Sequence, residues 1–243
     1  MKKLAIIPAR YASSRFPGKP LIDLNGKTMI QRVVEGVTNS KQFDEVVVAT
    51  DDEKIANHVK AIGRKVILTK PTHESGTDRC GEVIESFIEF DIVVNIQGDE
   101  PLVDAEQLRV LLAAFEDSTV EIATLGSPKI SATDIHDPNR IKIVLNQYSD
   151  ALYFSRSPIP FERSQEGYPF LKHIGLYGFR SETLKKLVQL PPTLLEKTES
   201  LEQLRWMYYG YKIRVVETDI ETPNIDTPED VEAVLEKLKG FRL

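Results

Sequence analysis

The stretch Leu4-Ala5-Ile6-Ile7-Pro8-Ala9-Arg10 is a short apolar run that leads directly into a loop of small and basic residues. Similar β-branched runs recur through the first half of the chain, at Leu4 to Ile7, Val46 to Thr50, Val66 to Thr69 and Ile92 to Gln97. Helical patterns separate them, one opened by Thr28, one following Asp51-Asp52 and one opened by Thr77 and running to Ile88. This alternation predicts an α/β fold with a parallel sheet, helices on both faces and right-handed crossovers. Ligands of such sheets gather beyond the carboxyl ends of the strands.

The second half of the chain is less regular. Strand-like runs occur at Glu121 to Leu125, Ile141 to Leu145, Ala151 to Phe154, His173 to Phe179 and Lys212 to Thr218, and helical patterns at Ser181 to Gln189, Ser200 to Tyr209 and after Pro228. Pro-rich segments between these runs predict a mixed extension of the sheet. Thr227 as N-cap, Pro228 at N1 and Asp230 at N3 predict the start of the last helix.

Size and charge narrow the class of protein. A chain of 243 residues predicts one domain, residues 1–243, with one main core. The single cysteine, Cys80, excludes an internal disulfide and indicates a reducing, cytoplasmic setting. A net charge of −6 argues against a general nucleic-acid-binding surface. The first apolar run is too short for a signal peptide or a membrane span, so no membrane insertion is expected.

The loop after the first strand carries three cations. Residues 8–20 read PARYASSRFPGKP, with Arg10, Arg15 and Lys19 spaced along them. Arginine forks and a lysine charge suit a triphosphate, and the loop follows the first strand, where doubly wound folds bind phosphates. The loop matches neither a Walker A motif nor a GxGxxG fingerprint. The alternative interpretation is a solvated basic loop; the combination of strand, small residues and three cations favours a phosphate-binding loop.

A second candidate segment follows the strand at Ile92 to Gln97. Asn95-Ile96-Gln97-Gly98-Asp99-Glu100-Pro101 places two acids at the predicted active edge of the sheet. Because Mg²⁺ prefers one or two carboxylates together with phosphate oxygens and waters, Asp99 is a suitable ligand. Gly98-Asp99 could equally form an ordinary turn. For Glu100 the favoured interpretation is a cap of the helix that follows.

The remaining candidates have simple structural alternatives. Ser75 and Thr77, within Glu74-Ser75-Gly76-Thr77-Asp78-Arg79, are suited to capping a helix, whose start could also present N–H groups, with Arg79, to a ligand. His173 and Tyr177 are an even number apart and should share one face of a strand. Ser200 and Gln203 have the spacing of a capping box. Local sequence alone does not single out Arg156, Glu202 or Asp226.

Taken together, these segments resemble those of the 3-deoxy-manno-octulosonate (Kdo) cytidylyltransferases, also called CMP-Kdo synthetases. The resemblance rests on IIPARYASSRFPGKPL (6–21), VVVATDD (46–52), ESGTDR (74–79), NIQGDEP (95–101), ALYFSRSPIP (151–160), KHIGLYGFR (172–180), LEQLR (201–205) and DTPED (226–230). These segments follow the family's order along nearly the whole chain. The first would match several sugar nucleotidyltransferases, whereas the later ones are specific to this family.

The resemblance implies a fold, partners and residue roles. The implied fold is the three-layer α/β/α nucleotide-diphospho-sugar transferase fold, with a mostly parallel central sheet and a mixed extension, usually as a homodimer. Residues 1–126 would be the CTP-binding half and residues 127–243 the sugar-binding and dimerisation half. The implied roles are triphosphate binding for Arg10, Arg15 and Lys19, nucleotide binding for Ser75, Arg79 and Gln97, Mg²⁺ binding for Asp99 and Asp226, and binding of the acidic sugar for Arg156, His173, Tyr177, Glu202 and Gln203.

The implied reaction is attack of the anomeric 2-hydroxyl of Kdo on the α-phosphorus of CTP, which gives CMP-Kdo and diphosphate for lipopolysaccharide biosynthesis. Arg10, Lys19, Asp99 and Asp226 would carry catalysis. Since the sequence names no clear general base, activation of the hydroxyl by metal is favoured.

Two departures from the family and two rival functions stand beside this prediction. Asn224-Ile225 replaces a common Gly-Val before Asp226, and Phe161 to Pro169 matches no family motif. The rivals are a CMP-sialic acid synthetase, which should differ across Ala151 to Arg180, and a catalytically silent nucleotide-sugar-binding protein, against which Asp99 and Asp226 argue.

Overall fold

The chain folds into two compact units. The computed structural model describes residues 1–12, 16–164, 166–225 and 227–240. The first unit comprises Met1–Leu108 and Thr222–Leu243, and the second comprises Arg109–Glu221. Among the described residues, the longest helices have 11 residues, and none is both long and apolar enough to cross a membrane.

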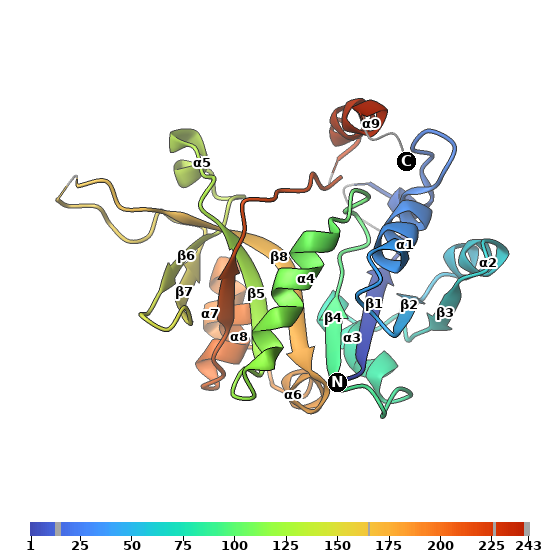
Figure 1. Ribbon diagram of the computed structural model, residues 1–243, viewed down its shortest axis with the longest axis horizontal. Helices are drawn as coiled ribbons and strands as arrows, with labels where there is room; N and C mark the ends of the chain where they lie inside the picture. Colours follow the sequence, from blue (N-terminus) through green and yellow to red (C-terminus); the bar gives the residue numbers. More distant parts are fainter. Residues whose placement is uncertain (13–15, 165, 226, 241–243) are drawn as a thin grey trace. The chain divides into compact units, whose positions relative to one another are not determined.

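The first unit is built around a parallel sheet in the order β3-β2-β1-β4 (Figure 1). Its elements are β1 (Lys3–Ala9), the short 3-10 helix η1 (Lys19–Leu21), α1 (Met29–Asn39), β2 (Glu45–Thr50), α2 (Glu53–Ala61), β3 (Lys65–Leu68), α3 (Gly76–Ile84), β4 (Ile92–Asn95) and α9 (Asp230–Gly240). The sequence boundary between the units falls within α4 (Ala105–Ala113), which the 3-10 helix η2 (Ala114–Glu116) follows. The predicted alternation of strands and helices in this half is confirmed.

Amphipathic patterning explains why α1 forms and where it packs. Thr28 caps the helix by accepting a hydrogen bond from the Gln31 amide, and the apolar side chains at positions 29, 30, 33, 34 and 37 are buried. This stripe recurs at helical spacing and contacts β1 and β2. Full burial of each such Ile, Val or Met side chain contributes about 1.5–3 kcal/mol. The expected helix start at Thr28 is confirmed.

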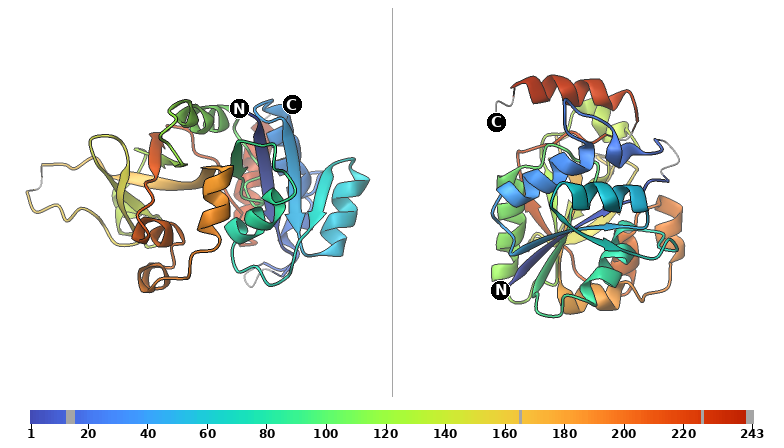
Figure 2. Two further views of the ribbon diagram at one scale, coloured as in Figure 1. Left: turned by 90° about the horizontal axis from the view of Figure 1, so that it is seen from below. Right: turned by 90° about the vertical axis from the view of Figure 1, so that its right-hand side faces the viewer.

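The strand order reverses between β1 and β4. From β1 the chain proceeds through β2 to β3 in one direction, and then returns to place β4 on the other side of β1. Because crossovers of this kind are right-handed, α1 and α2 cover one face of the sheet and α3 the other, as Figure 2 shows. The carboxyl ends of β1 and β4 therefore diverge and leave the crevice in which doubly wound folds bind ligands.

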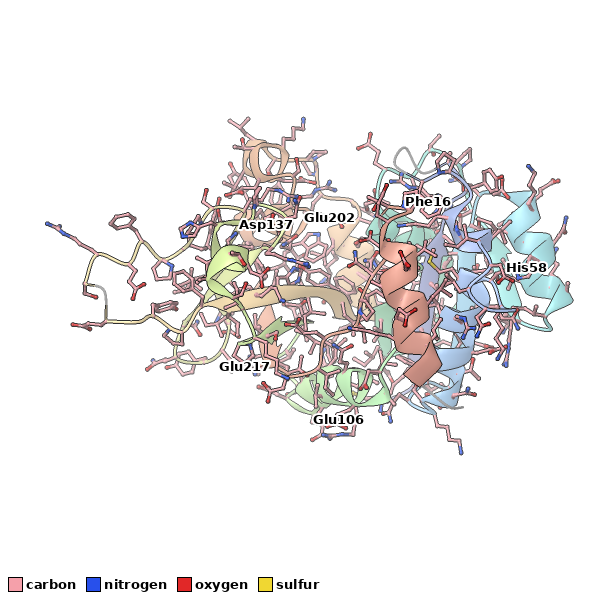
Figure 3. The ribbon with its side chains drawn as sticks, turned by 90° about the horizontal axis from the view of Figure 1, so that it is seen from above. Phe16, His58, Glu106, Asp137, Glu202 and Glu217 are labelled. Carbon is pink, nitrogen blue, oxygen red and sulfur yellow. The ribbon has the colours of Figure 1, made fainter. Side chains whose placement is uncertain are left out.

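The last segment of the chain returns to the first unit. Ile225 and Val234 pack with Leu24 and Met29 in one buried cluster, against which Phe16 also packs (labelled in Figure 3). The final helix begins at Asp230 rather than at Pro228, because Thr227 to Val231 form a tighter turn first. The Asp230 carboxylate accepts hydrogen bonds from the Thr227 amide and hydroxyl, as its predicted place in the cap requires.

The second unit contains a mixed sheet. Its elements are β5 (Ile122–Ser127), α5 (Ala132–His136), β6 (Lys142–Leu145), β7 (Ala151–Ser155), β8 (Leu171–Arg180), α6 (Ser181–Leu187), α7 (Leu194–Glu199), α8 (Gln203–Tyr208) and β9 (Arg214–Glu217). β5 pairs antiparallel with β8 and parallel with β9, and the β6–β7 hairpin joins β8 through β6. The predicted mixed extension is confirmed.

Four local predictions are wrong. Thr77 does not open the helix, because Ser75 is its N-cap and the helix begins at Gly76. The helix at 76–84 stops at Ile84, so Ile88 lies outside it and is 80% exposed. Glu100 does not cap the next helix, because Asp104 accepts the first amide hydrogen bonds of α4. Ser200 and Gln203 form no capping box, because Ser200 ends α7 in a left-handed conformation (φ 51°) and Glu202 precedes α8.

Candidate active site

The crevice of the first unit contains a polar cavity of about 250 Å³. Its walls come from the end of β1, from η1, from the turn before α3 and from the loop after β4. Six residues that the sequence predicted for the nucleotide site line it, namely Arg10, Lys19, Ser75, Arg79, Gln97 and Asp99. Segments as far apart in the sequence as Pro8 and Asp99 are thus brought together at the switch point of the sheet.

Lys19 binds the carboxylate of Asp99 in the cavity wall. Its Nζ donates to Asp99 Oδ2 and to the Ile225 carbonyl, each at 2.7 Å, and the Lys19 side chain is only 12% exposed. The Ile225 amide in turn donates to the Asp99 carbonyl at 2.9 Å. Two oxygens therefore already point at one cation, a donor set that suits a hard metal ion.

Asp99 is the described member of the predicted pair of metal ligands. In the described ranges, no group of three or more His, Cys, Asp or Glu side chains converges on a metal position. Asp226, the second predicted ligand, lies outside the described residues, as does Arg15 of the basic loop. Asp99 and the neighbouring Ile225 carbonyl are the described oxygens that would face such an ion.

Arg79 and Ser75 organise the start of α3. Ser75 and Asp78 form a complete capping box, which confirms the capping role of Ser75. Arg79 is 3% exposed, and its guanidinium donates to the Thr69 hydroxyl and, at 3.2 Å, to Asp51 Oδ2. These contacts fix Arg79 beside the cavity, while the helix start directs backbone N–H groups toward it.

Glu100 is an unusual acid beside this cavity. Burial, and then the charge of the adjacent Asp99, raises the pKa of Glu100 to about 8, although the Thr222 hydroxyl donates to its carboxylate at 3.5 Å. Part of the residue remains accessible. At neutral pH the Glu100 carboxyl group is therefore mostly protonated and can donate a hydrogen bond.

The predicted sugar-binding residues lie in the second unit. The rings of His173 and Tyr177 are 5.3 Å apart, so their expected placement on one face of a strand is confirmed. The pairing of β8 with β5 shifts between Thr124–Tyr177 and Leu125–Ile174, which leaves two extra residues in β8. In a regular strand, residues four apart would be about 13 Å apart, so this bulge brings the two rings together.

The surroundings make this cluster receptive to a polar ligand. Tyr177 Oη and Gln203 Nε2 are buried, and no described group forms a hydrogen bond of good geometry with either. Burial, and then the charge of Glu202 (labelled in Figure 3), raises the pKa of Tyr177. Burial lowers the pKa of His173 to about 3, so its imidazole is neutral and its Nε2 contacts the Thr124 hydroxyl at 3.0 Å. Unpaired buried polar atoms are costly, which points to a ligand with hydroxyl groups.

Arg156 is held by the backbone of its own unit. Its Nε, Nη1 and Nη2 donate to the carbonyls of Glu199, Pro138 and Ser200, at 2.6, 2.9 and 3.2 Å. A guanidinium has five N–H bonds, so two are left for a ligand within the described surroundings. Arg156 therefore has a structural role besides any contact with a sugar.

Three contributors to the nucleotide cavity were not among the predicted site residues. His73 and Glu74 line its wall immediately before Ser75. Gly98 also lines it, and a Cβ added there would stand 2.7 Å from the Pro8 carbonyl oxygen. A glycine at a strand end can signal close backbone approach, but only the three-dimensional contact shows which segment approaches.

Comparisons with known proteins agree with this geometry. A family model described as Cytidylyltransferase matches residues 4–213. The 3-deoxy-manno-octulosonate cytidylyltransferase of Parabacteroides distasonis is 51% identical over 246 residues, which cover 97% of each chain. That of Bacteroides thetaiotaomicron is 51% identical over 250 residues, with 99% of each chain covered.

Solved structures give the same result. A CMP:2-keto-3-deoxy-manno-octonic acid synthetase complexed with CTP matches with a TM-score of 0.94 and 45% identity, over 99% of each chain. A cytidylyltransferase from Leptospira borgpetersenii shares the fold, with a TM-score of 0.68 and 18% identity over 100% of this chain and 89% of the other. The chain therefore belongs to the cytidylyltransferases and, among them, to the 3-deoxy-manno-octulosonate cytidylyltransferase family.

Proposed function

We propose that this chain transfers the cytidylyl group of CTP to the anomeric 2-hydroxyl of Kdo, releasing diphosphate and forming CMP-Kdo. The observation that carries the proposal is the cavity at the β1/β4 switch point, where six predicted nucleotide-site residues converge. The relation to a synthetase complexed with CTP supports CTP as the nucleotide. We assign nucleotide binding to residues 1–126, and sugar binding and dimerisation to residues 127–243.

The cations of the cavity would bind the triphosphate. Arg10 and Lys19 line the cavity, and Arg15 belongs to the same loop in sequence. Charge gathers on the leaving diphosphate during the reaction, so fixed cations stabilise the transition state more than the ground state. Ser75, Arg79 and Gln97 would hold the rest of the nucleotide. Arg79 suits this role because its own contacts already fix its position.

Mg²⁺ is the proposed cofactor. The oxygens of Asp99 and Ile225 that hold the Lys19 ammonium at 2.7 Å form the kind of donor set that Mg²⁺ prefers. Asp99 and Asp226 would be its carboxylate ligands. When bound, the ion neutralises phosphate charge and acidifies the attacking hydroxyl. Lys19, released from Asp99, would then be available to the phosphates.

The acidic sugar would bind in the second unit. Tyr177 Oη and Gln203 Nε2 are buried without a hydrogen bond of good geometry from the described residues, so each can pair with a sugar hydroxyl, and Glu202 can accept from another. Neutral His173 is a positioning group in this proposal, because its low pKa makes it a weak base. The remaining N–H bonds of Arg156 suit a carboxylate.

Three finer parts of the proposal rest on the family. We infer that the protein acts as a homodimer, that it works in the cytoplasm, and that its product serves lipopolysaccharide biosynthesis. The rival function is activation of sialic acid by a CMP-sialic acid synthetase.

A diphosphate-release assay with CTP and a panel of acidic sugars tests the proposal. The panel comprises Kdo, 8-amino-Kdo and sialic acid, each assayed with and without Mg²⁺. Kdo should give the highest kcat/KM, and Tyr177→Phe and Gln203→Ala should raise KM for the sugar while KM for CTP stays unchanged. Tyr148→Phe, at a 66% exposed position, is the matched control. Preference for sialic acid, or no diphosphate release with any sugar, would contradict the proposal, whereas preference for 8-amino-Kdo would revise only the identity of the sugar.

A further inference from the structure

His73 lies just outside the predicted motifs in the sequence, but the structure places it in the wall of the nucleotide cavity. It precedes the 74–79 motif, in the turn between β3 and α3, and lines the nucleotide cavity with its side chain 17% exposed. Besides Glu74, Ser75, Gln97 and Asp99, which can accept hydrogen bonds, the cavity wall includes three side chains that only donate them, Arg10, Lys19 and Arg79. An imidazole can instead accept one, provided that its tautomer is fixed.

Glu82 fixes the orientation of this imidazole. His73 Nε2 hydrogen-bonds to Glu82 Oε2 on α3, and the same oxygen accepts from the Lys70 amide at 3.0 Å. Burial alone would raise the pKa of Glu82, but the hydrogen bonds from His73 and Lys70 lower it below its usual value. Glu82 is therefore an ionised carboxylate that can only accept, so Nε2 carries the proton. Glu82 itself is not among the described lining residues, so the ring is anchored on the side away from the cavity.

The second ring nitrogen of His73, Nδ1, is left to accept a hydrogen bond. In a neutral imidazole with the proton on Nε2, Nδ1 is an acceptor. Within the described part of the chain, no group hydrogen-bonds to His73 Nδ1, whereas Nε2 is engaged. Moving the proton to Nδ1 would leave the Glu82 carboxylate facing a lone pair, so the Glu82 contact opposes the other tautomer.

We propose that His73 Nδ1 is the acceptor that selects the 4-amino group of cytosine over the 4-oxo group of uracil. The inference rests on the proposed binding of CTP in this cavity. Cytosine and uracil differ at that position in the direction of the hydrogen bond, because an amine donates and a carbonyl accepts. With UTP two acceptors would face each other and remain unpaired, and sites built on such a pairing discriminate strongly.

Two substitutions at the same position separate the two ring nitrogens. In His73→Gln the amide nitrogen takes the place of Nε2 and can still donate to Glu82, but the acceptor at Nδ1 is lost. In His73→Asn the amide oxygen lies near the place of Nδ1 and can accept, but the contact with Glu82 is lost. Glu82→Gln is the control for charge, because the Lys70 amide, which donates to Glu82 Oε2, should hold the new amide oxygen in that place, where it still accepts from Nε2.

The measurement is the dissociation constant for CTP and for UTP by isothermal titration calorimetry without sugar, with Tm recorded for each variant. The wild-type protein should bind CTP more tightly than UTP. His73→Gln should reduce this preference at least tenfold, mainly by raising the dissociation constant for CTP. His73→Asn and Glu82→Gln should keep the preference within about threefold even if their Tm falls, as expected when one partner of a hydrogen bond changes but the acceptor remains.

Several results would overturn the inference. One is a folded His73→Gln protein that keeps the wild-type preference; another is an equal loss of preference in both His73 variants, which would assign the effect to the loop rather than to Nδ1. A wild-type enzyme that releases diphosphate from CTP and Kdo but binds UTP equally well would reject the inference and leave the proposed function standing. A wild-type protein that binds neither nucleotide would reject the proposed function itself.

Discussion

Replacing Gly98 with alanine should disturb the nucleotide cavity more than the fold. The new Cβ would lie 2.7 Å from the Pro8 carbonyl oxygen, roughly half an ångström closer than such atoms normally approach. Pro8 on β1 is paired with Ala49 on the neighbouring strand β2, so β1 cannot move away from the new Cβ without disturbing the sheet. Overpacking of this size costs about 1–3 kcal/mol, which in a chain of this length lowers Tm by about 2–12 °C.

The catalytic effect should be larger than this loss of stability suggests. Pro8, Ala9 and Arg10 line the cavity in sequence, so a shift of Pro8 is passed to the residues that face the nucleotide. A displacement of about 1 Å can cost a hundredfold in rate, so about half that shift should lower kcat/KM for CTP roughly tenfold. The assay is steady-state diphosphate release with CTP varied at saturating Kdo, beside thermal unfolding.

Gly36→Ala provides the matched control for Gly98→Ala. The added Cβ at position 36 would lie 3.1 Å from Val103 Cβ, in helix α1 and away from the described cavity wall. This control should change Tm modestly, because crowding opposes the gain in helix propensity, and should leave KM for CTP unchanged. Wild-type Tm together with wild-type kcat/KM in Gly98→Ala would refute the reasoning, and so would equal kinetic losses in both variants.

Three further outcomes follow from the same corner of the cavity. Asp99→Asn should fold but lose at least tenfold in kcat, equivalent to about 1.4 kcal/mol, and near wild-type kcat at limiting Mg²⁺ would reject the metal-ligand assignment. Lys19→Ala should raise KM for CTP more than KM for Kdo, and unchanged kinetics with both substrates would leave Lys19 only its structural contact with Asp99. Because the pKa of Glu100 is raised to about 8 in the folded state, the folded chain retains a proton there that the unfolded chain loses near pH 4.5. Stability should therefore fall as pH rises from about 4.5 to 8, and urea unfolding without divalent cations should show a smaller fall for Glu100→Gln, whereas parallel pH profiles would contradict the shift.

The first unit was largely predictable because its signals are local. Each strand run, the Thr28 cap and the Ser75 cap depend on neighbours within a few positions, and the switch point follows from chain handedness. Convergence of Arg10, Lys19 and Asp99 then follows from the rule that such folds bind ligands where the carboxyl ends of strands diverge.

The features that the sequence did not predict depend on contacts between distant positions. The 5.3 Å spacing of His173 and Tyr177 needs the bulge in β8, which is defined by pairing with β5. Glu100 was predicted to be a helix cap from its position before a helix. Its raised pKa could not be predicted, because it arises from burial, which no local sequence pattern reports. Arg156 looked free for a carboxylate because its three carbonyl partners come from other segments of the chain.

The return of the last segment to the first unit has a consequence for how the protein is made. The cluster around Leu24 and Met29 is completed by Ile225 and Val234, and the Lys19 ammonium donates to the Ile225 carbonyl. The first four strands will therefore have left the ribosome long before the residues that complete their unit, from Thr222 onward, have been synthesised. Joining the two ends across the intervening unit costs loop-closure entropy, although this cost grows only logarithmically with length. A nascent chain that ends at Glu221 contains the described lining residues of the cavity but lacks the Ile225 carbonyl that holds Lys19. We therefore expect full competence to bind nucleotide to be acquired late, after translation has passed Val234.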